Sequence, residues 1–396
     1  MNTRNIGSLL RTNKSLYNIY YYVGSFILRL LGLFIPVKKN RILFVSFGGL
    51  KYDDSPFEIY NAMINDDRFT NFQFVWAFLN PEKFVIPKGS IITVDTIRYF
   101  ITALSSGIWI TNSSVERGLS FRRKNGLYFN SWHGTPLKKM GSDLSFNNES
   151  FTSKASNNWD IQLAQSRYEA EIFSRVFNLS IDRLSVIGLP RNDKLTEVHE
   201  SDTIQKKKLL GIPPEKKVIL YAPTFREYLK DDKNNSSFSI PFSIPKWEEK
   251  LGRDYVLIIR AHYDIVKSLQ IPTSSFVLDY SNYENLNDLM IASDILISDY
   301  SSIFFDFSIL NRPMLCYAYD YDEYNSKRGL YFDIRKELGM LDVVSEDSLI
   351  DYILKLNVEK SIEITKRFRD KYVTHYGSAT KESLQYIYNW YKNNEK

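Results

Sequence analysis

The regular alternation of short apolar runs with helix-length segments constrains this fold more than any other feature of the sequence. Strands separated by helix-length segments favour a parallel, doubly wound α/β sheet. The apolar runs of strand length lie at 41–47, 72–78, 90–94, 108–111, 126–132, 160–166 and 183–190, and then at 218–225, 255–262, 276–281, 294–301 and 313–319.

The alternation is interrupted once, which predicts two Rossmann-like domains. Residues 194–217 are rich in charge and contain Pro213-Pro214. We therefore expect a basic, aromatic segment over 1–39, an N-terminal domain over 40–200 and a C-terminal domain over 201–396. Two such domains in tandem resemble a GT-B arrangement, in which ligands bind at the carboxyl ends of strands, here in the cleft that the domains face.

Composition excludes several classes of protein. The single cysteine, Cys316, rules out an intramolecular disulfide bond and a cysteine-built zinc site, and its apolar surroundings predict a buried thiol. No zinc-finger, RNP or helix-turn-helix pattern is present, so we expect no nucleic-acid partner. Residues 1–52 hold eight basic and no acidic side chains, whereas the whole chain carries +5 and the remainder therefore −3.

The basic N-terminal segment predicts an interfacial helix. From Val23 to Val37 it is almost wholly apolar, with Gly24 and Arg29 as interruptions. This run is short for a membrane span, which needs about 20 apolar residues. Flanking tyrosines and lysines favour peripheral association with an anionic membrane surface, and a helix docked on the protein's own body is the alternative.

Polar residues collect directly after the predicted strands. His133 follows one of them, and a neutral imidazole there could accept a proton from an attacking hydroxyl. Gly134 would let a substrate approach the backbone, and Lys138 and Lys139 would place positive charge near a phosphate. A histidine bonded only to the backbone of a turn is the competing interpretation.

The second domain repeats the pattern. Arg260 and His262 share one face of a strand end, where they could bind a diphosphate. Ser301 and Ser302 precede an apolar helix and would form an anion site or merely cap the helix. The remaining strand-end candidates are Thr224, Arg226 and Asp299, together with Gly188, Arg191 and Asn192 near the domain boundary.

A metal site is not expected. Asp320 and Asp322 form a D-x-D pair of the kind that can hold a divalent cation, but a solvated acidic loop is the favoured interpretation. The predicted chemistry requires no metal and no cofactor.

Seven blocks in order carry a family resemblance: "NSWHGTPLKKMG", "IGLPRND", "LYAPTFR", "IIRAHY", "ISDYSSIFFDF", "RPMLCYAYDYDEY" and "RGLYFD". Together they resemble the CDP-glycerol glycerophosphotransferase family, whose members build teichoic acids and related cell-surface polymers at the cytoplasmic face of the bacterial membrane. The resemblance implies a GT-B fold and a CDP-alditol donor bound mainly by the second domain. It implies that His133 supplies the catalytic base, with Thr135 near the acceptor or phosphate, and that His262 contacts the donor phosphates. It also implies that Arg226 and Arg260 supply positive charge for the diphosphate. The other residues that it places around the donor are Thr224, Asp299, Ser301, Ser302, Gly188, Arg191 and Asn192.

The resemblance favours transfer of glycerol phosphate from CDP-glycerol to a hydroxyl of a lipid-linked glycan or polyol-phosphate acceptor, with release of CMP. CDP-ribitol as donor and a nucleotide-sugar glycosyltransferase are the enzymatic alternatives. A membrane-bound nucleotide-binding scaffold is the alternative outside the enzymes. Primer or polymerase activity, and wall teichoic acid or capsule as product, stay open.

Overall fold

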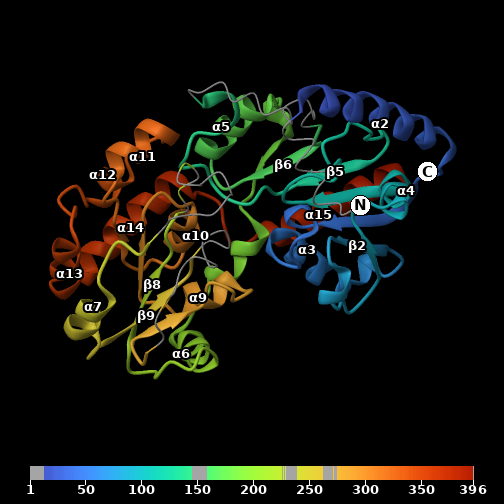
Figure 1. The fold of residues 1–396 in the computed structure, drawn as a ribbon. Helices are drawn as coiled ribbons and strands as arrows, with labels where there is room; N and C mark the ends of the chain where they lie inside the picture. The colour runs from blue at the N-terminus through green and yellow to red at the C-terminus, as the bar shows by residue number, and fades with distance from the viewer. Residues whose placement is uncertain are drawn as a thin grey trace. The chain divides into compact units, whose positions relative to one another are not determined.

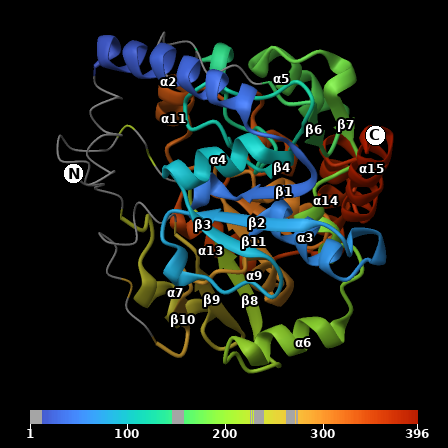
Figure 2. The same cartoon turned by 90° about the vertical axis from the view of Figure 1, so that its right-hand side faces the viewer.

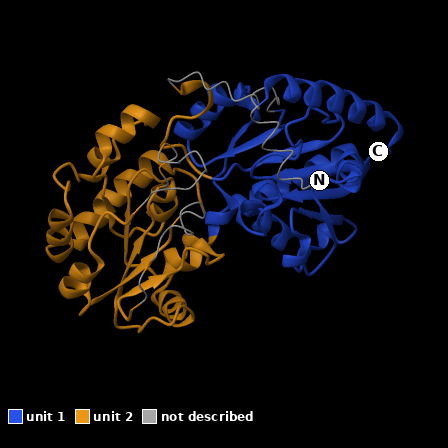
Figure 3. Cartoon of the chain, viewed as in Figure 1, with its two compact units in different colours: residues 1–133, 146–193, 378–396 blue, residues 134–145, 194–377 orange. Residues whose placement is uncertain are grey.

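The chain forms two compact units, each built on a parallel sheet (Figures 1 and 3). The computed structural model describes residues 13–144, 158–224, 226, 228, 239–261, 271 and 274–395. Unit 1 comprises Met1–His133, Phe146–Asp193 and Ser378–Lys396, and unit 2 comprises Gly134–Ser145 and Lys194–Gly377.

Unit 1 contains a seven-stranded sheet in the order β3-β2-β1-β4-β5-β6-β7, with every neighbouring pair parallel. From β1 the chain adds β2 and β3 on one side, and then returns to the other side of β1 to add β4 to β7. This is the doubly wound pattern that the alternation predicted. Its strands are β1 (Lys38–Val45), β2 (Gln73–Phe78), β3 (Ser90–Thr93), β4 (Ser106–Thr111), β5 (Leu127–Asn130), β6 (Ile161–Ala164) and β7 (Leu184–Val186).

Helices cover both faces of this sheet, which explains why its strands are almost continuously apolar (Figure 2). Alternate residues of β1 point to opposite faces: Ile42 and Phe44 join one core, and Leu43 and Val45 join the other. The helices of unit 1 are α2 (Lys14–Phe34), α3 (Asp54–Ile64), α4 (Ile97–Ser105), α5 (Arg167–Phe177) and α15 (Ala379–Asn394).

Unit 2 contains a five-stranded parallel sheet in the order β10-β9-β8-β11-β12. Its strands are β8 (Lys217–Tyr221), β9 (Tyr255–Ile259), β10 (Val277–Asp279), β11 (Ile295–Ser298) and β12 (Met314–Cys316). Its helices are α6 (Glu200–Leu209), α7 (Ile244–Leu251), α9 (Leu286–Ala292), α10 (Ile303–Ser308), α11 (Tyr321–Arg328), α12 (Ile334–Leu338), α13 (Glu346–Leu354) and α14 (Val358–Tyr372).

The structure confirms the predicted α/β class, because each predicted apolar run overlaps one of these parallel strands. The units themselves differ from the sequence boundaries at 39 and 200. Helix α15 lies in unit 1 because Leu384 and Ile387 pack into the core that contains α3. Strand alternation could not show which sheet a terminal helix covers.

Helix α2 docks on unit 1 and is not a separate unit. Its inner side buries Tyr17 and Leu28. Gly24 allows close packing, since a Cβ at that position would lie 3.1 Å from Leu119. Arg29, which interrupts the apolar run, donates to the carbonyl and the hydroxyl oxygen of Ser120 at 2.7 and 2.6 Å.

The outer side of α2 is apolar as well, and its side chains are largely exposed. Phe26, Leu33 and Phe34 are 67%, 76% and 79% exposed. The other exposed apolar residues of the helix follow helical spacing: Ile19, Tyr22, Val23, Ile27, Leu30 and Leu31. Along the described residues, no helix combines the length and the apolarity that crossing a bilayer requires.

Candidate active site

His133 lies at the carboxyl edge of the sheet of unit 1, where the last residues of three strands are in register. Val45 of β1 pairs with Thr111 of β4, which pairs with Asn130 of β5. The residues that follow these strands therefore meet at one place. His133 Nδ1 lies 2.7 Å from the carbonyl oxygen of Asn112.

Two aromatic rings hold the imidazole. Trp132 stacks on it with ring centroids 4.3 Å apart, and the Phe47 ring lies 5.6 Å away at a tilt. The residue is exposed at the surface, so a ligand can reach the ring. Because Nδ1 faces a carbonyl oxygen, it carries the hydrogen of the neutral ring, and Nε2 retains its lone pair.

The electrostatic surroundings favour the neutral imidazole. Desolvation among the surrounding protein atoms lowers the pKa of His133 below its ordinary value of 6.5. The hydrogen bond to Asn112 and the charge of Asp54 act in the opposite direction, and Arg191 adds to the lowering. Asp54 and Arg191 form an ion pair of 2.9 Å with both side chains largely buried.

Three predicted donor residues lie in unit 1, together with His133. Gly188 donates its N–H to the carbonyl of Ala164 at 3.0 Å and has a φ of +92°, which favours glycine. Arg191 pairs with Asp54, and the Asn192 amide donates to Gln165 at 2.8 Å. Gly188 and Asn192 thus stabilise the local backbone, and Arg191 neutralises the charge of Asp54.

The segment that follows His133 belongs to unit 2. Lys138 forms an antiparallel bridge with Leu330, and Lys139 N–H donates to the Gly329 carbonyl at 3.1 Å. Thr135 is buried. The space beside Gly134 is taken by Ser302, whose Oγ would lie 2.8 Å from a Cβ at that position. Gly134 thus allows close packing on Ser302, a role that the sequence did not reveal.

Arg226 occupies a different place from the one predicted. The sequence placed its guanidinium on a donor phosphate. Instead, Nε and Nη2 bond both oxygens of Asp320 at 2.7 and 2.9 Å, and Nη1 bonds Asp299 at 2.9 Å. Arg226 is 1% exposed and lies beside the rings of Tyr300 and Tyr324, which stack on each other and are each 5.0 Å from its guanidinium carbon. It is the centre of a buried charge cluster.

The same cluster corrects the interpretation of the D-x-D pair. Asp320 is not part of a solvated loop, because it binds Arg226 and accepts the Tyr300 hydroxyl hydrogen bond at 2.9 Å. Asp322 is exposed. Among the described residues, no group of three or more histidine, cysteine or acidic side chains is arranged to hold a metal ion.

The other predicted residues of unit 2 lie around this cluster or at neighbouring strand ends. Asp299 accepts the N–H groups of Thr224 and Tyr300 at 2.8 and 2.6 Å. Ser301 Oγ accepts the N–H of Ile303 at 3.2 Å, whereas Ser302, the N-cap residue of α10, makes no side-chain cap hydrogen bond. Arg260 donates to the carbonyls of Tyr280 and Ser281. His262 lies outside the described residues.

Two of the buried polar atoms that make no hydrogen bond among the described residues lie beside candidate site residues, one in each unit. They are the amide nitrogen of Asn112, beside His133, and the hydroxyl of Thr224, beside Asp299. Buried polar atoms are normally satisfied, so these two groups could each accept a hydrogen-bonding partner such as a water or a ligand.

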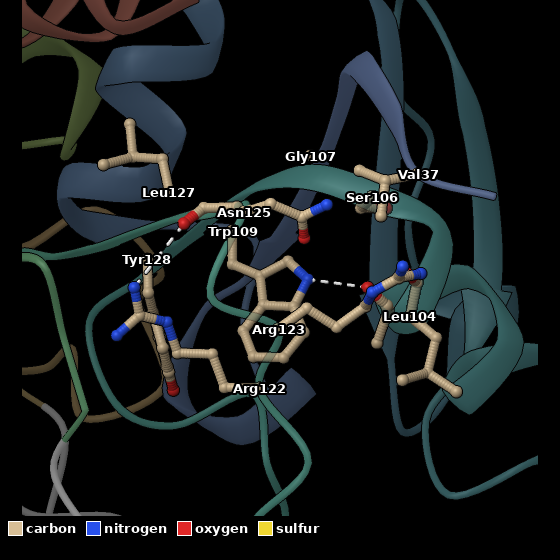
Figure 4. Close-up of a pocket in the computed structure, with 12 residues that line it drawn as sticks. Val37, Leu104, Ser106, Gly107, Trp109, Arg122, Arg123, Asn125, Leu127 and Tyr128 are labelled. Atoms are coloured by element: carbon tan, nitrogen blue, oxygen red, sulfur yellow. Dashed lines mark hydrogen bonds between the residues drawn. The ribbon is translucent and has the colours of Figure 1, made fainter. Parts of the chain in front are cut away.

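A small cavity lies at the opposite edge of the unit 1 sheet (Figure 4). Ser106 and Leu127, the first residues of β4 and β5, line it together with Trp109, Arg122 and Arg123. Its volume of about 10 Å³ has room for one water molecule at most. Trp109 donates to the Ala103 carbonyl at 2.9 Å there, so this cavity is part of the packing of unit 1.

Sequence reasoning missed Asn112 and Asp54, and it placed Asp320 in a solvated loop. Asn112 follows strand β4 as His133 follows β5, so its position was a usable signal. Nothing in the local sequence indicated that Asp54 would pair with Arg191, 137 residues away, or that Asp320 would pair with Arg226. Cys316 is buried as predicted, and burial raises the pKa of its thiol.

Two Rossmann-like units with polar strand ends define the GT-B-like class of α/β proteins. Residues 27–389 match the family described as CDP-Glycerol:Poly(glycerophosphate) glycerophosphotransferase. The chain belongs to this family, as its sequence blocks indicated.

Relatives of known name agree with this assignment. A teichoic acid glycerol-phosphate transferase of Staphylococcus aureus is 32% identical over 88% of this chain and 93% of its own length. A teichoic acid poly(glycerol phosphate) polymerase of Staphylococcus epidermidis is 34% identical over 76% of this chain, which spans only 43% of that relative. A teichoic acid ribitol-phosphate primase of Bacillus spizizenii is 23% identical over 90% of this chain.

A solved structure extends the similarity to the whole fold. The wall teichoic acid polymerase TagF superposes with a TM-score of 0.82 at 29% identity, covering 98% of this chain and 99% of the solved chain. A variant of the same polymerase has been solved after soaking with CDPG.

Proposed function

We propose that this protein transfers glycerol phosphate from CDP-glycerol to a hydroxyl group of an acceptor. The acceptor oxygen forms a bond to the phosphorus that carries glycerol. The bond from that phosphorus to the bridging oxygen of the diphosphate breaks, and CMP leaves with its electron pair. His133 Nε2 takes the proton of the acceptor hydroxyl.

The geometry of His133 is the observation that carries this proposal. Its Nδ1 is held 2.7 Å from the Asn112 carbonyl, its ring is stacked on Trp132, and its pKa is lowered, so Nε2 can act as a base near neutral pH. Membership of the family and the 32% identity to a glycerol-phosphate transferase support glycerol over ribitol as the alditol.

The donor side of the reaction is assigned to unit 2. The unpartnered hydroxyl of Thr224, with Ser301 and Ser302, would bind the donor. Arg260 and His262 would contact its diphosphate, since fixed cations supply much of the catalysis of phosphoryl transfer. Arg226 would hold Asp299 and Asp320 in place without touching the phosphates, because both carboxylates already occupy its guanidinium.

The charged residues nearest His133, and Lys138 in the segment that follows it, also have proposed roles. Arg191, with Asp54, would fix the charge around the imidazole, while Gly188 and Asn192 hold the turn that carries Arg191. Lys138 would add positive charge for the phosphate of the acceptor or donor. The proposed chemistry assigns no step to a metal or to another cofactor.

Helix α2 would place the protein at the cytoplasmic face of the membrane. Its outer apolar stripe and the eight basic residues of 1–52 suit the boundary of an anionic bilayer. A peripheral position there would bring the protein to a lipid-linked acceptor, which stays in the bilayer.

Substituting two side chains of this stripe tests the membrane proposal. In Phe26→Glu/Phe34→Glu, association with vesicles that contain anionic phospholipid should fall at least a hundredfold, since each buried phenylalanine contributes about 1.5–3 kcal/mol. Co-sedimentation measures the effect. Val85→Glu, at a residue 89% exposed elsewhere in unit 1, is the matched control and should bind as the wild type does. Equal binding of all three proteins would refute the role of α2.

The pH dependence of kcat/KM tests the state of His133. The base must be neutral, so kcat/KM should rise with pH through a midpoint below 6.5 and stay level toward pH 8. Folding stability should fall as pH drops through the same range, because the unfolded histidine binds its proton more tightly. Asp53 could titrate in the same range, because burial and the charge of Asp54 raise its pKa to about 6. Asp53→Asn is therefore the control, and the midpoint of its kcat/KM profile should equal that of the wild type. A midpoint above 6.5 would contradict the assignment.

Release of CMP tests the proposed function. CDP-glycerol, CDP-ribitol and a nucleotide sugar are offered separately with a lipid-phosphate acceptor. We expect CMP from CDP-glycerol alone. Release from CDP-ribitol alone would show that CDP-ribitol is the donor. Tight binding of CDP-glycerol without turnover on any lipid acceptor would favour a nucleotide-binding scaffold that is not an enzyme.

A further inference from the structure

Left-handed backbone conformations gather around His133. Seven non-glycine residues of the described part have a positive φ. Such residues are uncommon and cluster at functional sites. Five of the seven follow strands β1, β3, β4 and β5 at the carboxyl edge of the unit 1 sheet. Phe47, Asp95, Arg117 and Trp132 lie in the connections after these strands, and Asp54 is the first residue of α3.

The turn at Phe47 and the imidazole of His133 are held by the same residue. Asn112 accepts the Phe47 N–H at 2.7 Å with its side-chain oxygen, and its carbonyl oxygen holds His133 Nδ1 at the same distance. The next residue, Ser113, accepts the Gly48 N–H at 3.0 Å. A shift of this turn would therefore move the ring of Phe47 against the imidazole.

Arg117 holds the outer side of this turn. Its Nη1 donates to the Gly48 carbonyl at 3.1 Å, and its Nε and Nη2 bond both oxygens of Asp95 at 2.8 Å each. A Cβ at Gly48 would lie 3.0 Å from Nη1, so the guanidinium lies directly against the turn. The bidentate pair fixes the orientation of the guanidinium.

Helix α2 holds Arg117 from the other direction. The Tyr20 hydroxyl donates to the Arg117 carbonyl at 3.1 Å, and the Tyr17 hydroxyl donates to the Gly118 carbonyl at 3.2 Å. Every contact in this series lies within unit 1. The series of contacts leads from helix α2, through Arg117 and Gly48, to the ring of Phe47, which packs on His133.

We propose that Arg117 is a positioning residue for His133, and that it couples the docking of helix α2 to the placement of the imidazole. The proposal rests on the proposed role of His133 as the base. Arg117 does not touch the reacting atoms, since its guanidinium is engaged by Asp95 and Gly48. A small displacement of a reacting group can lower a rate about a hundredfold.

Nuclear magnetic resonance of the imidazole nitrogens tests the coupling without requiring turnover. The chain contains four histidines, so the His133 signals can be assigned by comparison with His133→Ala. Asp54 and Arg191 are the charged groups that act on this ring, and both are kept in every variant. In Arg117→Ala we expect altered His133 nitrogen shifts and an altered titration midpoint, with kcat lowered at least tenfold and KM for CDP-glycerol within twofold of wild type.

Three further variants guard the test against a general loss of structure. Arg117→Lys, which retains a charge but not the bidentate pair, should restore part of kcat. Tyr20→Phe removes only the hydroxyl that donates to the Arg117 carbonyl, and it should shift the His133 signals less than Arg117→Ala does. If Arg117→Ala does not fold, Tyr20→Phe decides the test. Arg167→Ala removes an exposed pair with Glu171 in the same unit and should change nothing.

Unchanged His133 signals in Arg117→Ala and Tyr20→Phe would overturn the proposal, as would an equal change in Arg167→Ala. If the His133 signals shift in Arg117→Ala but the wild-type protein releases no CMP, the coupling stands and the proposed function is refuted instead. The two failures are therefore distinguishable.

Discussion

His133→Ala should lower the rate of CMP release from CDP-glycerol about 10²–10⁴-fold, the range that general-base catalysis contributes. The variant loses the one Nε2 lone pair that the structure holds at the edge of the unit 1 sheet. KM for CDP-glycerol should change little, because the proposed donor contacts lie in unit 2. Steady-state kinetics at pH 7.5, with thermal unfolding measured in parallel, give the comparison.

A second histidine supplies the control for this prediction. His199 is exposed and lies at the N-cap of α6, where asparagine is equally acceptable. His199→Asn should therefore turn over at the wild-type rate. A folded His133→Ala protein with a normal rate would eliminate His133 as the base.

Arg226→Ala should lower the free energy of unfolding by about 3–5 kcal/mol, since removing one partner of a buried ion pair leaves uncompensated charge. Here two carboxylates lose their partner: Asp299 with a side chain 3% exposed and Asp320 with one 15% exposed. The rings of Tyr300, Tyr319 and Tyr324 would also lose their contact with the guanidinium. Urea unfolding measures the change.

Two further variants distinguish the loss of the charge cluster from a general defect. Lys355→Ala breaks an exposed pair with Asp351 in the same unit, and such pairs contribute about 0.3–0.5 kcal/mol. Arg226→Met/Asp299→Asn/Asp320→Asn removes all three charges and should recover much of the stability. An Arg226→Ala protein within about 0.5 kcal/mol of wild type, the range expected for a surface substitution, would show that the cluster is not a stabilising centre.

The fold could be read from the sequence because both faces of each sheet are covered. A strand such as β1 must then be apolar at successive residues, and Ile42 to Val45 are. The termini were harder to predict. Helix α15 packs on unit 1 through Leu384 and Ile387, but nothing within residues 379–394 indicates which sheet they cover.

The candidate site could be predicted where a residue's position along a strand decides its place. His133, Thr224 and Asp299 lie at strand ends as expected, because parallel strands place their carboxyl ends at one edge. Long-range partners could not be predicted. Arg226 was expected on a phosphate, and its pairing with Asp320 depends on tertiary contacts across 94 residues that no local pattern encodes.

Helix α2 shows the same limit in another way. The sequence left open whether this segment meets the membrane or the protein's own body. Its buried side, with Tyr17 and Leu28, docks on unit 1, while the side that carries Phe26 and Phe34 stays exposed. Because both sides are apolar, hydropathy alone could not separate the two faces.

The most direct measurement of the central claim follows the glycerol phosphate itself. CDP-glycerol with isotopically labelled glycerol is incubated with the protein and a lipid-phosphate acceptor, and the acceptor is analysed by mass spectrometry while CMP is quantified. We predict that the acceptor gains labelled glycerol phosphate in an amount equal to the CMP released, and that His133→Ala gives neither. CMP released with free labelled glycerol phosphate and an unchanged acceptor would contradict the claim, because the protein would then hydrolyse the donor and not transfer its glycerol phosphate.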